Sequence, residues 1–156
     1  MQENDLMQRI RQLEDTAALK KLVDTFSNLA DRKDIDQQIL LFTENATVES
    51  YFGGQLVSSL AGREQIGAAF TGYLGNFDTV YHHNGQQTVE IGGDSATGVS
   101  YCLVVLIGMD NGKRIQNTSG VIYQDRYVRH DGGWLIDQRV SHFTWQERSE
   151  LPSAVE

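Results

Sequence analysis

The sequence predicts an α+β fold in which a curved, mostly antiparallel sheet wraps around helices. Apolar residues recur at helical spacing in the first third, whereas the last half holds four long strand-like runs separated by hairpin signals. Helices followed by an antiparallel meander are typical of α+β domains. Strands of a dozen or more residues exceed the usual length of about 5–6, so we expect them to bulge and curl. Such a sheet leaves a cavity between its concave face and the long helix.

The N-terminal third predicts one long helix followed by a short one. There is no Pro or Gly before Gly53, and one apolar stripe is formed by Leu6, Ile10, Leu13, Ala17, Leu22, Phe26 and Leu29. Asp15-Thr16 predicts a helix start, which would leave residues of about 1–12 as a separate arm. Asp34 or Asp36 is placed to cap a short helix over Gln37 to Phe42.

The remaining segments complete a single domain over residues 1–156. "ATVESYF" and "QLVSSL", joined by Gly53-Gly54, predict a hairpin, and "AGREQIGAAFTGYL" predicts a third helix. Four strands follow, separated by "GGD", "DNGK" and "HDGG": Thr79–Ile91, Ala96–Met109, Arg114–Arg129 and Trp134–Trp145. Residues of about 147–156 are expected to form a C-terminal tail.

Composition excludes several classes of partner. The formal net charge of −8 disfavours nucleic acid and anionic membrane as main partners, because both require a basic face. The N-terminus lacks a signal-peptide apolar segment, and no apolar run approaches the ~20 residues of a membrane span, so we expect a cytoplasmic protein. The single cysteine, Cys102, lies in the apolar run "YCLVVLI" and is expected in the core rather than as a nucleophile. The four histidines show no metal-ligand spacing, and no metal is expected.

Asp31 and the adjacent histidines His82 and His83 are the first candidate site residues. A carboxylate at a helix C-terminus opposes the macrodipole, so Asp31 is either a solvated end residue or held there for function. Adjacent strand residues point to opposite faces, so His82 and His83 cannot both enter one pocket. A bulge at Gly85 would change the alternation, and the pattern alone does not decide between the two histidines.

The last strand supplies Arg139. Strict alternation places Arg139 opposite the face of Trp134, Ile136 and Val140. There it would form either a buried anion site or an ion pair with Asp125 or Asp137. The strand tyrosines Tyr51, Tyr101 and Tyr123 are candidate pocket hydroxyls, although strand tyrosines are more often packing residues.

Several motifs in order resemble a known family. They are "LADRKD", "LFTENATVES", "GREQI", "HHNGQQTVEIGGDSATG", "GVIYQDRYVRHDGGW" and "LIDQRV". Their order resembles the SnoaL-like branch of the nuclear-transport-factor-two-like superfamily over roughly Leu13 to Trp145. The resemblance implies a cone-shaped barrel, with three helices and a deep pocket. Relatives include dehydratases, a hexachlorocyclohexane dehydrochlorinase, polyketide cyclases, steroid isomerase relatives and non-enzymatic binding modules.

The resemblance also implies a site. Asp31 falls on the Asp that pairs with a strand His, and His82-His83-Asn84-Gly85-Gln86 fits the family pattern H-x-x-G-N with His82 in the leading place. Arg139 falls on an Arg of the dehydrochlorinase. The catalytic residues that the resemblance implies are Asp31, His82 and Arg139, and we expect the substrate-binding residues to be Phe26, Tyr51, Tyr101, Tyr123 and Phe143. Relatives can carry a polar residue where this chain has Phe26, which removes one possible acid.

These residues predict a cofactor-independent lyase of the dehydratase or dehydrochlorinase type. An Asp31–His82 dyad would abstract a proton from a small hydrophobic or aromatic ring compound. One alternative is an isomerase or cyclase with an Asp base, and another is a non-catalytic binding or assembly domain. We also expect a homodimer or higher homo-oligomer, because long and partly apolar strands leave an outer sheet face that one domain cannot cover.

Overall fold

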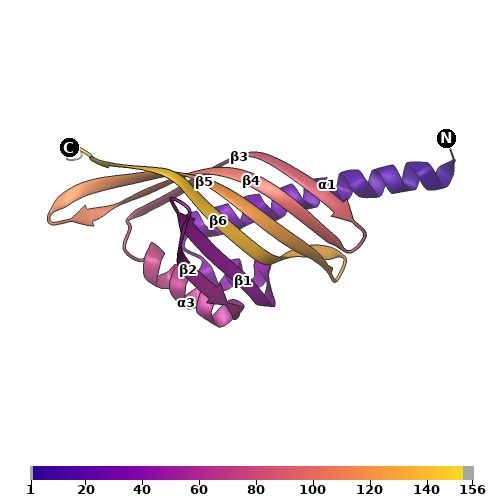
Figure 1. Ribbon diagram of the computed structural model, residues 1–156, viewed down its shortest axis with the longest axis horizontal. Coiled ribbons are helices and arrows are strands. Elements are labelled where there is room, and N and C mark those ends of the chain that lie inside the picture. Colours follow the sequence, from indigo (N-terminus) through magenta and orange to yellow (C-terminus); the bar gives the residue numbers. More distant parts are fainter. Residues whose placement is uncertain (1, 153–156) are drawn as a thin grey trace.

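A computed structural model describes residues 2–152 as three α-helices and a six-stranded curved sheet (Figure 1). The helices are α1 (Glu3–Asp31), α2 (Ile35–Gln38) and α3 (Gly62–Leu74), with a 3₁₀ turn η1 (Ile39–Leu41) after α2. The strands are β1 (Phe42–Phe52), β2 (Gln55–Ala61), β3 (Thr79–Gly92), β4 (Ser95–Asp110), β5 (Lys113–His130) and β6 (Gly133–Glu150). The predicted α+β class, the third helix, the first hairpin and the four long strands that follow are confirmed.

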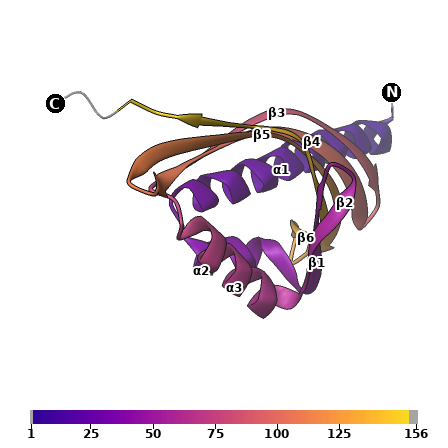
Figure 2. The ribbon, with the colours of Figure 1, turned by 60° about the vertical axis from the view of Figure 1, so that its left-hand side comes forward.

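The sheet has the strand order β2-β1-β6-β5-β4-β3. All neighbours are antiparallel except β1 and β6, which run parallel. The first hairpin is therefore added to the far side of the last strand, rather than beside the strand that follows it in the chain. Figure 2 shows the sheet curving around α1, with α2 and α3 on its open side. This arrangement forms the expected cone.

Helix α1 is continuous from Glu3 to Asp31, and the predicted start at Asp15-Thr16 is wrong. Because neither Pro nor Gly interrupts this segment, the helix continues past the edge of the sheet (Figure 1). Its first turns carry Leu6, Met7, Ile10 and Leu13 as exposed side chains. Asp15 instead accepts hydrogen bonds from Arg129 and from Trp134 Nε1, which fix the helix to β5 and β6.

The core fills the space between α1 and the concave sheet face. One cluster joins Leu19, Val23 and Phe26 of α1 to Phe42, Tyr127 and Ile136 of the sheet, and Ile66 of α3 closes it. A second cluster contains Ala30, Leu74, Val104 and Cys102, so the cysteine is a core residue as predicted. The predicted C-terminal tail begins too early, because β6 pairs with β5 as far as Glu150. Residues 153–156 of that tail lie outside the described residues.

A bulge in β6 overturns the strict alternation expected around Arg139. The register moves from Gln138 opposite Arg126 to Ile136 opposite Tyr127, which leaves Asp137 as the extra residue. Trp134, Ile136 and Arg139 are consequently all buried on the inner side. Strict alternation had placed Arg139 on the face opposite Trp134 and Ile136. Asp137 stays near the surface, where its carboxylate binds Thr43 and Arg126.

Candidate active site

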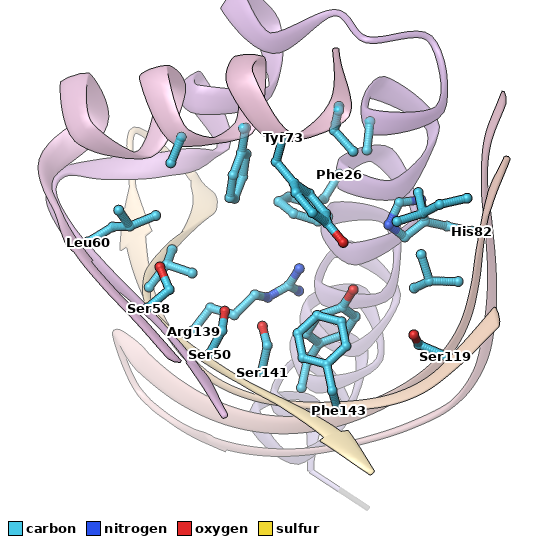
Figure 3. A pocket seen from close by; sticks show the side chains of 18 of the residues that line it. Phe26, Ser50, Ser58, Leu60, Tyr73, His82, Ser119, Arg139, Ser141 and Phe143 are labelled. Carbon is cyan, nitrogen blue, oxygen red and sulfur yellow. The ribbon is translucent and has the colours of Figure 1, made fainter. Parts of the chain in front are cut away.

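A cavity of about 350 Å³ opens between α1, α3 and the concave face of the sheet (Figure 3). Its helical wall is mostly apolar, with Phe26, Ala69, Phe70 and Leu74, and it also carries the polar side chains of Gln38 and Tyr73. Its sheet wall combines apolar side chains with His82, Arg139 and four serines, Ser50, Ser58, Ser119 and Ser141. The cavity therefore suits a small, mostly apolar molecule that carries a few polar groups.

Asp31 and His82 form a direct contact at the end of α1. Nδ1 of His82 lies 2.7 Å from Oδ1 of Asp31, and the His82 backbone N–H donates to the same carboxylate at 3.0 and 3.2 Å. The His82 side chain is 8% exposed and lines the cavity. Asp31 stabilises the donor at Nδ1, so Nε2 is the ring nitrogen left to meet a ligand. This pair explains why a carboxylate is held at an electrostatically unfavourable helix end.

The contact with Asp31 places His82 at the cavity, and the bulge in β3 lies beyond both adjacent histidines. His83 points outward and is exposed, as alternation requires once His82 faces inward. The register between β3 and β4 shifts between Asn84 and Gln87, so the side chains beyond the bulge return to the inner face. Asn84 donates to Asp24 and accepts from Ser27, and Gln87 donates to the Leu19 carbonyl. Successive turns of α1 are thus fixed to β3 on either side of the bulge.

Arg139 is held by charge and by aromatic faces. Its Nε and Nη2 donate to the two oxygens of Asp125 at 2.8 and 2.9 Å, so of the two partners considered, Asp125 is the one used. The guanidinium carbon lies 4.2 Å from the Phe26 ring centroid and 4.0 Å from that of Tyr123. Burial acts to lower the pKa of Arg139, but the Asp125 carboxylate outweighs it and raises that pKa. Nη1 has no hydrogen-bond partner among residues 2–152.

The predicted substrate-binding residues divide into two groups. Phe26, Tyr123 and Phe143 line the cavity. Tyr101 does not, because it alternates with the buried Ser100 and Cys102 and is 42% exposed on the outer face. Tyr51 is also absent from the cavity wall, because it stacks on the outward-facing His142 and donates to Glu49. For these two tyrosines the prediction of a pocket position is wrong.

The serines and Tyr73 are cavity residues that the sequence analysis missed. Ser50 shares the inner face of β1 with Val48 and Phe52. Ser58 of β2 and Ser141 of β6 lie opposite Ser50 on the two neighbouring strands. Alternation within "VESYF" would have placed Ser50 with Phe52, but the pairing of β1 with β6 was needed to bring Ser141 beside it. Tyr73 comes from the exposed end of α3 and lies at the cavity in Figure 3.

Among the residues that the structure describes, the other reactive groups give no second site. Burial raises the pKa of the Cys102 thiol to about 11, which leaves it in the neutral, unreactive form near pH 7. Burial likewise raises the pKa of Tyr123. Within the described part of the chain, no three His, Cys, Asp or Glu side chains are grouped to hold a metal ion. Over the same residues, no helix combines the length and apolar character needed to cross a bilayer.

A model of the SnoaL-like domain matches residues 11–140 of this chain. The chain belongs to the SnoaL-like family. A relative from Mycobacterium tuberculosis, itself an uncharacterized protein, is 25% identical over 142 residues and covers 90% of this chain and 93% of its own length. The family match confirms the resemblance drawn from the sequence motifs.

Solved structures show the same fold at low sequence identity. One is a putative scytalone dehydratase from Novosphingobium aromaticivorans, with a TM-score of 0.76 at 21% identity over 92% of this chain and 93% of that one. Another is a type-3 hexachlorocyclohexane dehydrochlorinase from Novosphingobium barchaimii, with a TM-score of 0.72 at 16% identity over 92% and 94% of the two chains. At these identities the likeness establishes the nuclear-transport-factor-two-like fold alone. The reaction has to be inferred from the residues of the site.

Proposed function

We propose that this SnoaL-like protein is a cofactor-independent lyase of the dehydratase or dehydrochlorinase type that acts on a small ring compound. The observation that carries the proposal is the 2.7 Å contact between His82 Nδ1 and Asp31 Oδ1 at the wall of an apolar cavity. A carboxylate that holds one ring nitrogen fixes the tautomer and orientation of a histidine base. The arrangement presents Nε2 to the bound molecule.

The reaction begins with the transfer of a proton from a ring carbon to Nε2 of His82. The C–H electron pair moves into the ring, forms a carbon–carbon double bond and releases the leaving group from the adjacent carbon. If the leaving group is a hydroxyl, His82 returns the proton to that oxygen and water departs. If it is chloride, the ion departs and the proton passes to solvent. Asp31 stabilises the imidazolium between the two steps.

Arg139 assists from the floor of the cavity. Its Nη1 is a donor without a partner among the described residues, so it can meet the oxygen of a carbonyl or leaving group as negative charge develops. Asp125 and the two aromatic rings hold the guanidinium in place before the reaction, so little reorganisation is required. These contacts support the role that the family resemblance implies for Arg139.

The contacts of Asp31 favour this mechanism over its alternatives. In an isomerase or cyclase with Asp31 as the base, the carboxylate would have to meet the substrate. Both its oxygens instead accept hydrogen bonds from His82, and Asp31 is not among the cavity-lining residues. A purely binding or assembly role would not require a carboxylate and a histidine to be paired at the pocket wall.

Elimination from simple ring ketones tests the proposal. 3-Hydroxycyclohexanone and 3-chlorocyclohexanone both give cyclohexenone, whose formation is followed by ultraviolet absorbance. We expect the protein to accelerate at least one elimination, His82→Ala to abolish the acceleration, and Asp31→Asn to lower it by roughly 10²–10⁴-fold. His83→Ala is the matched control and should retain most of the rate. A wild-type protein inactive on both ketones, or an active His82→Ala variant, would contradict the proposal.

A further inference from the structure

Three serine hydroxyls form a row across the sheet wall of the cavity. Ser50 of β1 lies directly opposite Ser58 of β2 and opposite Ser141 of β6. All three residues line the cavity, and Figure 3 shows their side chains on the wall that faces the helices. Neighbouring strands lie about 4.7–4.9 Å apart, so side chains directly opposite each other across the row are separated by roughly 5 Å. The row therefore places three polar groups at a spacing comparable to that of substituents around a ring.

These hydroxyls are not used within the fold. No side-chain hydrogen bond joins Ser50, Ser58 or Ser141 to another residue in the range 2–152. Each hydroxyl offers one donor and two acceptor positions. A ligand that fills the cavity without polar atoms would strip water from these groups and leave them unpaired, which is unfavourable.

Arg139 provides an independent polar group beside the row. It is 1% exposed, lies two residues before Ser141 on the inner face of β6, and lines the same cavity with Nη1 unpartnered among the described residues. Its charge is already matched by Asp125, which is itself buried. Nη1 therefore offers a hydrogen bond without a net positive charge to attract an anion.

We infer that Ser58, Ser50, Ser141 and Arg139 Nη1 form a subsite for an uncharged ring substrate that carries several oxygen substituents. The oxygenated edge of the ring would lie along β2, β1 and β6, and its apolar face would lie against Phe70 and Leu74. A halogenated ring is disfavoured, because carbon-bound halogens are weak hydrogen-bond acceptors and no donors. The inference rests on the proposed function, and it selects oxygenated over halogenated substrates for that same cavity.

Equilibrium dialysis of matched bicyclic probes tests the inference without any turnover. The probes are 1,3-dihydroxynaphthalene, 1,3-dichloronaphthalene and 2-naphthoate. We expect the dihydroxy compound to bind at least roughly tenfold more tightly than the dichloro compound. The naphthoate should bind no more tightly than the dihydroxy compound, since Asp125 already neutralises Arg139.

Serine variants identify the subsite. Ser50→Ala and Ser141→Ala should each weaken binding of the dihydroxy probe by roughly 3- to 10-fold and leave the dichloro probe unchanged. Ser59→Ala is the matched control, because Ser59 follows Ser58 on β2 but is exposed on the outer face. The dialysis requires no turnover whereas the elimination assay does, so failure of the subsite and failure of the proposed chemistry are distinguishable. Equal affinity for the dihydroxy and dichloro probes, no binding of the dihydroxy probe at millimolar concentration, or no effect of the serine variants would overturn the inference.

Discussion

Arg139 and Asp125 are the most deeply buried charges of the site, with side chains 1% and 0% exposed. Asp125 accepts two hydrogen bonds from Arg139 and a third from the Tyr127 hydroxyl. Asp125→Ala would leave the guanidinium buried without a countercharge, and we expect it to lower the free energy of unfolding by about 3–5 kcal/mol. Urea denaturation measures this difference. Asp110→Ala removes an exposed pair with Arg148 and should cost at most about 1 kcal/mol. A loss in Asp125→Ala as small as that of the control would refute the account of this pair.

At the same scale, sequence reasoning found the catalytic candidates but not all of their neighbours. Asp31 is conspicuous because its charge opposes the helix dipole, yet choosing His82 over His83 required the family pattern. Tyr51 and Tyr101 were misplaced because tyrosines occur on both faces of a sheet, so the residue type alone does not tell which face a strand tyrosine occupies. The serines were missed because their grouping depends on which strands become neighbours, and that pairing is a long-range property.

At the scale of elements, the fixing of α1 to the sheet through Asp15 depends on pH. The Arg129 guanidinium beside Asp15, assisted by Trp134, holds the pKa of that carboxyl below its ordinary value of 3.8. A lowered pKa in the folded state stabilises the fold above the ordinary value, and this contribution is lost as the pH falls through the lowered pKa. Asp15→Asn should therefore reduce stability by roughly 1–3 kcal/mol at pH 7. Thermal unfolding followed from pH 7 to pH 3 should show this difference from wild type shrinking below about pH 4, whereas a constant difference would exclude the ion pair as its cause.

The β4 strand packs closely on Tyr127 at Gly98. A Cβ on Gly98 would lie 2.8 Å from Cε2 and 3.0 Å from the hydroxyl oxygen of Tyr127, a ring that is fully buried and hydrogen-bonded to Asp125. Gly98→Ala should destabilise the protein by about 1–3 kcal/mol in chemical denaturation. Gly92→Ala, which meets no atom within 4 Å, should change stability much less. Similar values for the two variants would show that β4 can move away from Tyr127.

The elements themselves were largely predictable, and the exceptions have physical causes. Periodicity and turn residues located the helices and the long strands, because these signals are local. The start of α1 was misplaced because Asp15-Thr16 is a good capping pair, although it lies within a segment that no Pro or Gly interrupts and that is helical throughout. The bulge at Asp137 was not predictable from β6 alone. It depends on the pairing with β5 that places both Ile136 and Arg139 inside.

At the scale of the whole molecule, the outer face of the sheet is incompletely covered. Tyr81, Tyr101, Leu103 and Trp145 are each 41–56% exposed. Leu103, Gly120 and Trp145 occupy one row across β4, β5 and β6, and the Trp145 indole lies so close that a Cβ on Gly120 would come within 2.0 Å of its Nε1. This row forms an apolar surface of the kind that mediates association.

We therefore predict that the protein forms a homodimer or higher homo-oligomer through this face. Light scattering should give a mass of at least twice the 17.5 kDa of one chain at micromolar concentration. Leu103→Glu should shift the equilibrium toward the single chain, because it places a charge within the apolar row. Leu40→Glu is the control, since Leu40 is exposed in η1 on the helical side. A wild-type protein that remains at 17.5 kDa would refute the prediction.

The central claim is that His82, held by Asp31, acts as a base toward a molecule in the cavity. Proton–deuterium exchange measures this step directly, without a leaving group. 2-Tetralone in deuterium oxide exchanges its ring C–H protons next to the carbonyl, and ¹H NMR follows their loss. We predict that the wild-type protein and His83→Ala both accelerate the exchange, whereas His82→Ala leaves it at the rate without protein. Exchange that survives in His82→Ala, or that disappears in His83→Ala instead, would contradict the assignment of His82 as the base.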